Sequence, residues 1–267
     1  MKIVSWNVNG IRSVIAKSKD GTRNQSNQSN QSQDNVLKCL ICEVAPDVIC
    51  LQELKCSDEH TSILDQYKNT HPYIYTHCAS NTRGYSGVAL MSNFAAIQVV
   101  KTGGPEGRII AAEFDKFIVV SCYTPNSKRQ LERLDERINK WEPMFREFIT
   151  TLATKTIIIM GDLNVVRSIQ DIYKPKPSSP CCTIEEQNAF QTLLIECELT
   201  DTFRALNPTA RAYTYFSNFA NSRAKNNGWR LDYALVSNCL VDRVTASTIL
   251  SDYYGSDHVP IMIELNV

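Results

Sequence analysis

The sequence lacks any long apolar run, since no window approaches the roughly 18 to 20 apolar residues that a membrane-spanning helix needs. Its N-terminus also lacks the charged leader and apolar stretch of a secretory signal. We therefore expect a soluble intracellular protein, in the nucleus or the cytoplasm, that is not secreted and binds no membrane.

Net charge is absent as well, because 28 Lys and Arg residues balance 28 Asp and Glu residues. No overall basic field attracts a polyanion, so any phosphate-binding surface must arise from local asymmetry. An apolar fraction of 43% in 267 residues is ordinary for a globular protein with a substantial core. No repeat spans the chain and no linker divides it, so we predict a single domain over residues 1–267.

The chain contains ten cysteines, and without a secretory signal we interpret them as reduced thiols. Cys39 and Cys42 have the spacing of half a zinc site, but no second C-x-x-C motif follows and their apolar neighbours repeat at helical spacing. We therefore predict that both are small core residues. Apolar side chains are nearly missing from residues 18–35, which predicts a mobile surface insertion within the domain.

Apolar periodicity and turn residues predict alternating strands and helices. The predicted strands are 2–7, 47–51, 73–77, 88–92, 109–114, 117–122, 157–160, 213–215, 230–236 and 261–265. The strands between 73 and 122 have the spacing of an antiparallel meander. The predicted helices are 36–44, a polar stretch that ends at Tyr67, about 130–152, and 184–196.

Polar residues occupy the positions at which these predicted strands end. In Thr156–Val165, four apolar residues run directly into Gly-Asp-Leu-Asn, which by itself could be only a turn after a buried strand. Asn7 and Asn9 are likewise either turn formers or groups that hold phosphate or metal. The other polar residues at predicted strand ends are Glu53, Tyr123, Asn126, Asp232, Asp257 and His258.

Eight short motifs follow one another in a characteristic order: WNVNG, LQE, GYSGV, EGRIIAAEF, YTPN, GDLN, GWRLDY and SDH. With them the sequence resembles the exonuclease III class of apurinic/apyrimidinic endonucleases, in the endonuclease/exonuclease/phosphatase superfamily, over almost all of the chain. The resemblance implies a four-layered α/β sandwich, in which two mixed, mostly antiparallel sheets pack face to face with helices outside. The active site is then at one end of the sandwich.

The implied reaction is hydrolysis of a DNA phosphodiester 5′ to an abasic site in base excision repair, which leaves a 3′-hydroxyl and a 5′-deoxyribose phosphate. Such enzymes commonly also show 3′-to-5′ exonuclease or 3′-phosphodiesterase activity. The implied partner is double-stranded DNA with abasic or blocked 3′ lesions, and we expect a monomer. The implied cofactor is Mg²⁺, with Mn²⁺ as a substitute. Glu53 is the expected main ligand, and Asp257 and Asn9 complete the shell.

The resemblance also implies catalytic roles. Asp162, with Asn164 beside it, orients or deprotonates the attacking water. His258 contacts the scissile phosphate and is held in its tautomer by Asp232. The residues expected to position or polarise phosphate oxygens are Tyr123, Asn7 and Asn126.

The expected DNA contacts distinguish an abasic-site endonuclease from other phosphodiesterases of the superfamily. Trp229, Tyr215 and Leu231 match a small apolar pocket for an extruded sugar without a base, although such aromatics are also common in cores. Phe219 and Arg129 match positions that enter the DNA stack. Local positive charge near the site comes from Arg223, Lys225, Arg230, Lys128 and Arg129.

Two departures from the family leave part of the interpretation open. Arg167 stands where many relatives have His, and the loop 174–183 replaces an Asn-rich loop, so phosphate contacts there and the balance of exonuclease to endonuclease activity are undecided. One alternative is a phosphodiesterase of the same superfamily that acts on phosphoinositide or phospholipid. Another is a DNA-binding module without catalysis, against which the intact acids argue.

Overall fold

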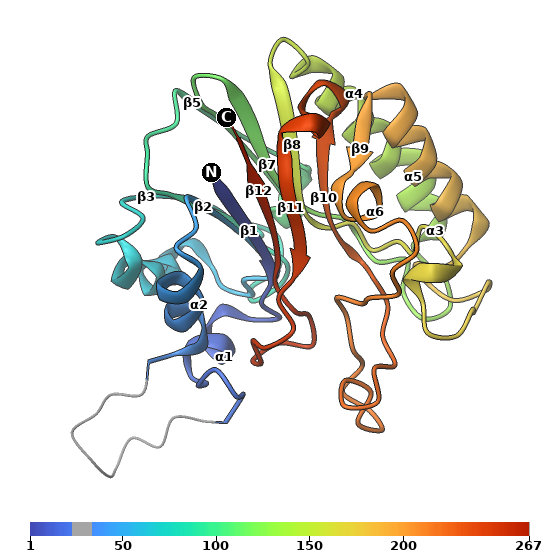
Figure 1. The fold of residues 1–267 in the computed structure, drawn as a ribbon, viewed down its shortest axis with the longest axis horizontal. Helices are drawn as coiled ribbons and strands as arrows, with labels where there is room; N and C mark the ends of the chain where they lie inside the picture. Colours follow the sequence, from blue (N-terminus) through green and yellow to red (C-terminus); the bar gives the residue numbers. More distant parts are fainter. Residues whose placement is uncertain (23–33, 267) are drawn as a thin grey trace.

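The computed structural model describes residues 1–22 and 34–266. Two six-stranded sheets pack face to face, and helices cover their outer faces (Figure 1). The predicted four-layered α/β sandwich is confirmed. Most of the predicted insertion at 18–35 lies outside the described residues, so its mobility stays a prediction.

The first sheet is built from both ends of the described chain. Its strands are β1 (Lys2–Asn7), β2 (Val48–Gln52), β3 (Tyr73–His77), β4 (Val88–Ser92), β11 (Val244–Ile249) and β12 (Ile261–Leu265). They lie in the order β11-β12-β1-β2-β4-β3, so the two chain ends are neighbours in β1 and β12. Strands β1, β3, β4 and β12 have the predicted bounds.

The second sheet is formed by the middle of the chain. Its strands are β5 (Gln98–Thr102), β6 (Ile109–Glu113), β7 (Phe117–Tyr123), β8 (Thr156–Asp162), β9 (Leu199–Asp201) and β10 (Asp232–Ser237). Their order is β5-β6-β7-β8-β10-β9. In each sheet, one central pair, β1 with β2 and β7 with β8, is parallel.

The helices form the outer layers. On the first sheet lie α1 (Ile11–Ile15), α2 (Val36–Val44) and the 3₁₀ helix η1 (Asp58–Tyr67). The second half of the fold contributes α3 (Leu134–Glu136), the π-helical η3 (Arg137–Trp141), α4 (Glu142–Thr151), α5 (Ile184–Glu196) and α6 (Thr202–Leu206). Short 3₁₀ turns are η2 (Gly104–Glu106), η4 (Ile169–Asp171) and η5 (Asn238–Arg243). Among the described residues, no helix has both the length and the apolar character needed to cross a membrane.

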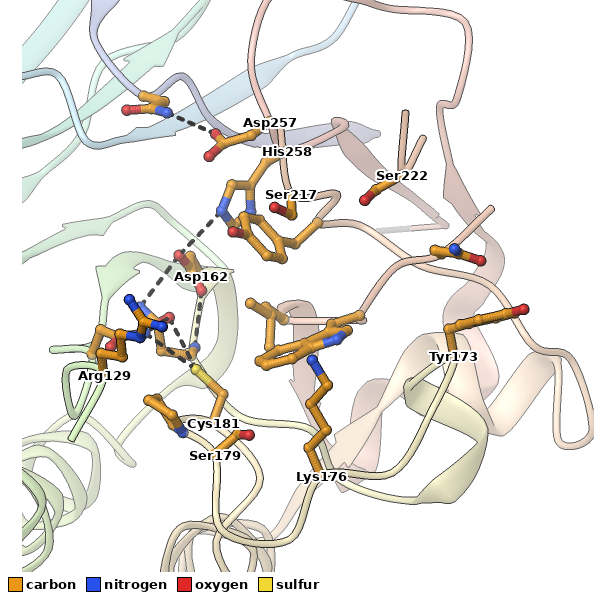
Figure 2. Close-up of a pocket in the computed structure, with 18 of the residues that line it drawn as sticks. Arg129, Asp162, Tyr173, Lys176, Ser179, Cys181, Ser217, Ser222, Asp257 and His258 are labelled. Carbon is orange, nitrogen blue, oxygen red and sulfur yellow. Dashed lines mark hydrogen bonds and ion pairs between the residues drawn. The ribbon is translucent and has the colours of Figure 1, made fainter. Parts of the chain in front are cut away.

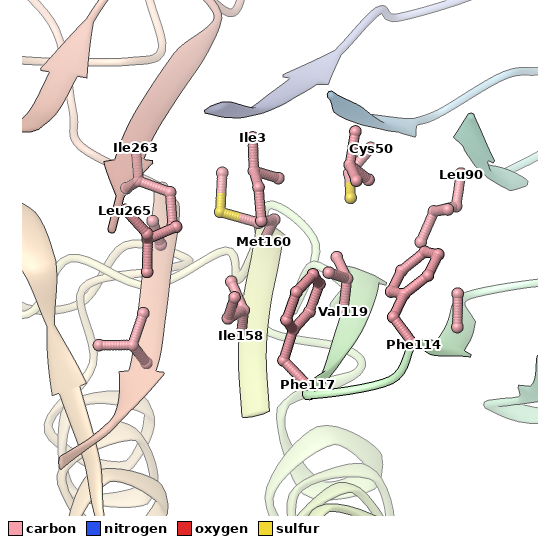
Figure 3. Packing of buried hydrophobic residues seen from close by; sticks show 14 of the residues in the cluster. Ile3, Cys50, Leu90, Phe114, Phe117, Val119, Ile158, Met160, Ile263 and Leu265 are labelled. Atoms are coloured by element: carbon pink, nitrogen blue, oxygen red, sulfur yellow. The ribbon is translucent and has the colours of Figure 1, made fainter. Parts of the chain in front are cut away.

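The alternation of each strand divides its apolar side chains between two cores. In β8, Ile158 and Met160 face the other sheet, while Ile157 and Ile159 pack under α4 and α5. Because helices cover the outer faces, both sides of this strand are apolar, which explains its uninterrupted apolar run. Figure 3 shows the layer between the sheets, where Ile3 and Met160 approach from opposite sides.

Some predicted elements were wrong in detail. The predicted meander over 73–122 is divided between the sheets, since β3 pairs with β4 while β6 pairs with β7 and with the unpredicted β5. Residues 213–215 form no strand, and Tyr215 makes only isolated bridges. Cys42 is exposed and Cys39 is half-buried, so the prediction that both are core residues was wrong for Cys42.

The predicted helix over 130–152 begins at Leu134 and contains a π-helical segment, Arg137–Trp141. That segment ends two residues before Pro143. Proline has no N–H to donate to a carbonyl one turn earlier, and this accounts for the locally wider turn. The distortion matters for the site, because it is the segment that carries Arg137.

Candidate active site

Strand pairing in the second sheet brings together three of the predicted polar residues. Tyr123 at the end of β7 pairs in register with Asp162 at the end of β8, and Asp162 pairs with Asp232 at the start of β10. Gly161 permits this arrangement, because a Cβ on it would lie 1.9 Å from the carbonyl oxygen of Cys122. The glycine of the Gly-Asp-Leu-Asn motif therefore has a packing role inside β8.

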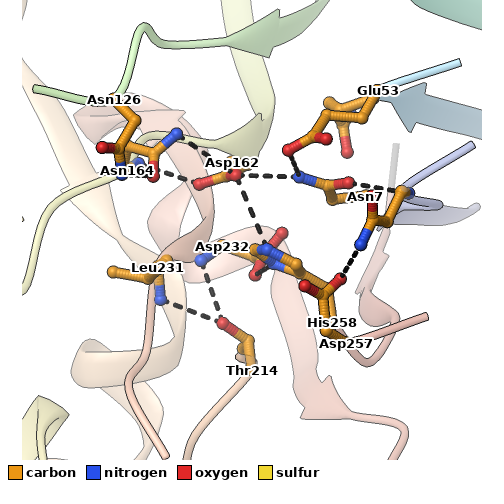
Figure 4. A network of polar contacts seen from close by, with 12 residues as sticks. Asn7, Glu53, Asn126, Asp162, Asn164, Thr214, Leu231, Asp232, Asp257 and His258 are labelled. Carbon is orange, nitrogen blue, oxygen red and sulfur yellow. Dashed lines mark hydrogen bonds and ion pairs between the residues drawn. The ribbon is translucent and has the colours of Figure 1, made fainter. Parts of the chain in front are cut away.

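The first sheet contributes its polar groups at the same end of the sandwich. Asn7 pairs in register with Gln52, and Glu53 follows Gln52 directly. The side-chain amide of Asn7 donates to Glu53 Oε1 at 3.0 Å and to Asp162 Oδ2 at 2.9 Å. One buried amide thus joins the two sheets across the candidate site (Figure 4).

The carboxylate of Asp162 is buried, with 1% of the residue exposed. Its Oδ1 accepts the backbone N–H of Asn164 at 2.9 Å, and its Oδ2 lies 3.8 Å from Nε2 of His258. Burial raises the pKa of Asp162 to about 7; the charge of His258 opposes this rise, and the carboxylates of Asp232 and Glu53 add to it. A carboxyl group poised near neutrality suits a general base.

Beside Asp162 lies a histidine held by a second carboxylate. Nδ1 of His258 lies 2.7 Å from Oδ2 of Asp232, whose backbone N–H donates to Thr214 Oγ1 at 3.0 Å. Burial lowers the pKa of His258, but the charges of Asp232 and Asp162 outweigh it and raise the pKa to about 10. The ring is therefore an imidazolium at neutral pH, and Nε2–H is the donor that faces Asp162.

Glu53 is the second acid that faces the interior of the site. Its Oε1 accepts the hydroxyl of Tyr123 at 2.7 Å, and its Oε2 pairs with Nζ of Lys55 at 2.8 Å. Burial raises the pKa of Glu53, but the donors Asn7, Lys55 and Tyr123 together lower it. Burial, with the charge of Glu53, raises the pKa of Tyr123 well above its usual range, so the phenol remains a proton donor.

The predicted metal ligands offer the oxygen donors that a hard cation requires. Asn9 donates from Nδ2 to Oδ1 of Asp257 at 2.9 Å, and both residues line the same cavity as Glu53. The ammonium of Lys55 contacts Glu53 and the side-chain oxygen of Asn9, so a positive charge already lies among these oxygens. The described residues contain no cluster of three His, Cys, Asp or Glu side chains placed to hold a metal. The donor set therefore fits a cation that keeps waters and substrate oxygens, as Mg²⁺ commonly does.

A cavity of about 880 Å³ opens beside these groups, and Trp229, Tyr215 and Leu231 form part of its wall. The rings of Trp229 and Tyr215 lie edge to face with centroids 6.2 Å apart, and Tyr215 also lies 5.0 Å from the ring of His258. Trp229 and Tyr215 are half-buried, so both rings reach the cavity instead of ending in the core. The arrangement combines an apolar pocket with acid, base and cation-binding groups.

Residues 4–258 match the model of the Endonuclease/Exonuclease/phosphatase family. The chain belongs to this family. A zebrafish (Danio rerio) relative named DNA repair nuclease APEX1 is 36% identical, over 100% of this chain and 83% of the relative. An exodeoxyribonuclease of Bacillus subtilis is 36% identical over 100% of both chains. The solved structure of an AP endonuclease from Leishmania major covers 100% of this chain and 87% of its own, with a TM-score of 0.85 and 26% identity.

This family is one of metal-dependent nucleases. Further polar groups of the chain lie around the cavity. Asn126 donates from Nδ2 to Oδ1 of Asn164 at 3.1 Å and to Sγ of Cys181 at 3.3 Å. Figure 2 shows Arg129 and Lys176 among the residues that line the cavity. The structure therefore brings Asn126 and Arg129 to the site.

The residues predicted to touch DNA beyond the cavity lie on the loop before β10. Phe219 is 83% exposed, and Lys225 is exposed as well. Arg223 differs, because its guanidinium lies 3.8 Å from the ring centroid of Tyr254 and donates to the carbonyls of Ser251 and Tyr253. Arg223 was predicted to supply free positive charge near the site. In the structure its guanidinium is engaged in these contacts instead, and it stabilises the loop.

Sequence reasoning missed several groups in this endonuclease/exonuclease/phosphatase site. Lys55, Lys176 and Cys181 all line the cavity. The sequence signal for Lys55 was its position two residues after Glu53, the acid at the end of a strand. The signal for Lys176 was its position in the loop 174–183, which departs from the family. Arg167, which stands where many relatives have His, pairs with Asp201 at 3.2 Å and does not line the cavity.

Proposed function

We propose that this protein is a DNA-repair endonuclease that hydrolyses the phosphodiester on the 5′ side of an abasic site, leaving a 3′-hydroxyl and a 5′-deoxyribose phosphate. One observation carries the proposal: the pocket walled by Trp229, Tyr215 and Leu231 opens beside Asp162 and His258. A sugar without a base can be extruded into a compact apolar pocket, whereas an intact nucleotide must also find room for its base. The relatives named as DNA-repair nucleases and AP endonucleases support the same substrate.

In the proposed reaction, Asp162 orients the attacking water and accepts its proton, with Asn164 holding the carboxylate in place. The imidazolium of His258 donates from Nε2 to a non-bridging phosphate oxygen, and Asp232 keeps the ring in that orientation. The groups that would position or polarise the remaining phosphate oxygens are Tyr123, Asn7 and Asn126. Hydrogen bonds already fix Asn7, Tyr123 and Asn126, of which the Asn7 bond to Asp162 is buried and the other two are partly buried.

The proposed metal is Mg²⁺, with Mn²⁺ as a substitute. Glu53 would be its main protein ligand, and Asp257 and Asn9 would complete the shell. When bound, the metal supplies Lewis-acid neutralisation of the phosphate oxygens and of the leaving alkoxide. The lowered pKa of Glu53 supports this assignment, because the ligand must be ionised to bind a cation.

The proposed partner is double-stranded DNA with abasic or blocked 3′ lesions, bound by a monomer. Arg129 and Lys225 would contact backbone phosphates, and the exposed ring of Phe219 would enter the base stack at the lesion. Additional 3′-to-5′ exonuclease and 3′-phosphodiesterase activities are proposed from the same site, since each breaks a phosphodiester at a 3′ oxygen.

The direct test uses a duplex that contains a single tetrahydrofuran abasic analogue. With Mg²⁺ we expect one cut on the 5′ side of the analogue and none in the undamaged duplex, and EDTA should abolish the cut. Product ends are identified on a sequencing gel and by polymerase extension of the 3′-hydroxyl. Lack of cleavage with Mg²⁺, or faster hydrolysis of a phosphoinositide than of the abasic duplex, would falsify the proposal.

Replacing Trp229 by Ala should lower kcat/KM on the abasic duplex about tenfold to hundredfold, because an enlarged pocket no longer orients the sugar. Removal of a terminal phosphate from a nicked duplex needs no extruded sugar and should change less. Tyr73→Ala is the matched control, since Tyr73 is an exposed aromatic on β3 outside the cavity. An unchanged preference for the abasic duplex in Trp229→Ala would show that the pocket does not recognise the lesion.

A further inference from the structure

Arg137 is a guanidinium side chain with only 1% of the residue exposed, and it is absent from the lining of the active-site cavity. It lies at the start of the π-helical segment Arg137–Trp141. Its guanidinium donates from Nη2 to the carbonyl of Leu163 at 2.8 Å and from Nη1 to the carbonyl of Asn164 at 2.6 Å. The same Nη1 lies 3.3 Å from the carbonyl of Pro125.

These carbonyls belong to the two short segments that carry polar groups of the site. Asn164 has a left-handed backbone with φ 48°, which is uncommon outside glycine. Its N–H donates to Asp162 Oδ1 at 2.9 Å, and its side chain donates to the carbonyl of Thr124 at 2.9 Å. The guanidinium of Arg137 therefore holds two consecutive peptide groups: the one between Leu163 and Asn164, whose N–H donates to Asp162, and the one that follows Asn164.

Two buried carboxylates keep the guanidinium in place. Nε of Arg137 lies 3.2 Å from Glu142, and Nη1 lies 3.2 Å from Oε1 of Glu186. Glu186 also forms the capping box of α5 with Thr183 and accepts the hydroxyl of Ser127. The cluster thus ties Ser127, which follows Asn126, and Thr183, the N-cap of α5, to Leu163 and Asn164 at the end of β8.

The cost of burying these charges argues for a role beyond stability. Desolvating an ion pair consumes most of its Coulombic gain, and an apolar cluster of the same volume would often be as stable. An apolar cluster, however, cannot hydrogen-bond the carbonyls of Leu163 and Asn164, which among the described residues have no other donor. A planar guanidinium supplies several donors in one rigid fork.

We propose that Arg137 is a positioning residue for the nuclease reaction: by clamping the carbonyls of Leu163 and Asn164, it sets the orientation of the Asp162 carboxylate. The inference rests on the proposed function, because it concerns the same reaction. If the wild-type protein does not cut abasic DNA, the proposed function fails. If the wild-type protein cuts and the Arg137 variants behave like it, only this inference fails.

The first experiment compares Arg137→Lys with Arg146→Lys. Arg146 is the matched control, since it lies on α4 and pairs with Glu196 at 2.9 Å near the surface. Lysine keeps the positive charge beside the carboxylates but cannot reach both carbonyls with one ammonium group. On the abasic duplex, Arg137→Lys should lower kcat about tenfold to hundredfold, while its Kd for the same duplex in EDTA stays within about twofold.

The second experiment places Arg137→Lys in the background of Asp162→Asn. If Arg137 acts through the Asp162 carboxylate, the double variant should be less than about twofold slower than Asp162→Asn alone. A purely structural role would multiply the two losses instead. Thermal unfolding of each variant identifies the temperature at which all are folded, and the rates are compared there.

Glu186→Gln provides a second route if Arg137→Lys does not fold. The glutamine keeps the shape of the capping residue but removes one charge that anchors the guanidinium, so kcat should fall about threefold to tenfold with Kd unchanged. The inference is overturned by a kcat of Arg137→Lys within about twofold of wild type, by an equal fall in Arg146→Lys, or by losses that multiply in the double variant.

Discussion

Replacing Asp162 by Asn should lower kcat on abasic DNA about a thousandfold, which corresponds to roughly 4 kcal/mol of lost transition-state stabilisation. The amide keeps the size of the side chain but cannot accept a proton from water. Because Asn7 and Asn164 donate hydrogen bonds to the carboxylate and only 1% of Asp162 is exposed, we expect it to make little contact with bound DNA. The Kd for the abasic duplex in EDTA should therefore stay nearly constant, the pattern of an interaction made mainly in the transition state.

Asp65→Asn is the matched control, since Asp65 makes an exposed ion pair with Lys68 and lies outside the cavity. It should retain wild-type kcat and Kd. Single-turnover cleavage and fluorescence anisotropy of the labelled duplex measure the two quantities separately. A loss of affinity as large as the loss of rate in Asp162→Asn would assign Asp162 a structural role.

The pH dependence of the wild-type rate follows from the same carboxyl group. Its pKa is raised to about 7 by burial, and a general base works only when it has lost its proton. Activity should therefore fall as the pH drops below neutrality and the carboxyl becomes protonated. This acid limb should be missing from the residual activity of Asp162→Asn, measured with single-turnover rates between pH 5 and about 8.

Replacing His258 by Gln should lower kcat about a hundredfold to a thousandfold. The imidazolium brings a positive charge to within 3.8 Å of Asp162 and faces the cavity, whereas Gln keeps a donor but loses the charge. Asp232→Asn should be slower than wild type for a related reason, because the 2.7 Å bond to Nδ1 both orients and charges the ring. Cleavage rates at saturating DNA and metal measure both effects.

A double variant separates these roles. If Asp232 acts through His258, then Asp232→Asn combined with His258→Gln should be about as slow as His258→Gln alone. His60→Gln is the control, since His60 is an exposed histidine in the first turn of η1 and is not part of the cavity lining. Multiplicative losses in the double variant would mean that the two residues contribute independently.

Local sequence features predicted much of the site because they act over short distances. A strand that ends in a polar residue places that residue at the end of the sheet where the strands terminate. This holds for Asp162 in β8 and for Asn7 in β1. Exact bounds were predicted for β1 and α2, where an apolar pattern meets a clear stop. The half-exposed strand β5 was missed, because its apolar alternation is interrupted by Lys101.

Long-range contacts could not be read in the same way. The direction of Arg223 depends on Tyr254, and the clamp of Arg137 depends on Leu163 and Asn164, each more than twenty residues away. Such pairs leave no local periodicity, since their members meet only after the layers have packed. For the same reason Lys55 was not predicted to share the oxygens of Glu53 and Asn9.

The sequence by itself determined the family, the layered α/β architecture and the identity of the polar residues at the strand ends, because ordered motifs and apolar patterns specify these directly. Only the tertiary structure decided which strands share a sheet, how Asn7 joins Glu53 to Asp162, and which charges are buried against one another. Sheet pairing and desolvation are properties of surfaces brought together from distant parts of the chain. The proton affinities of Asp162 and His258 arise at those surfaces, and so does the chemistry we propose for them.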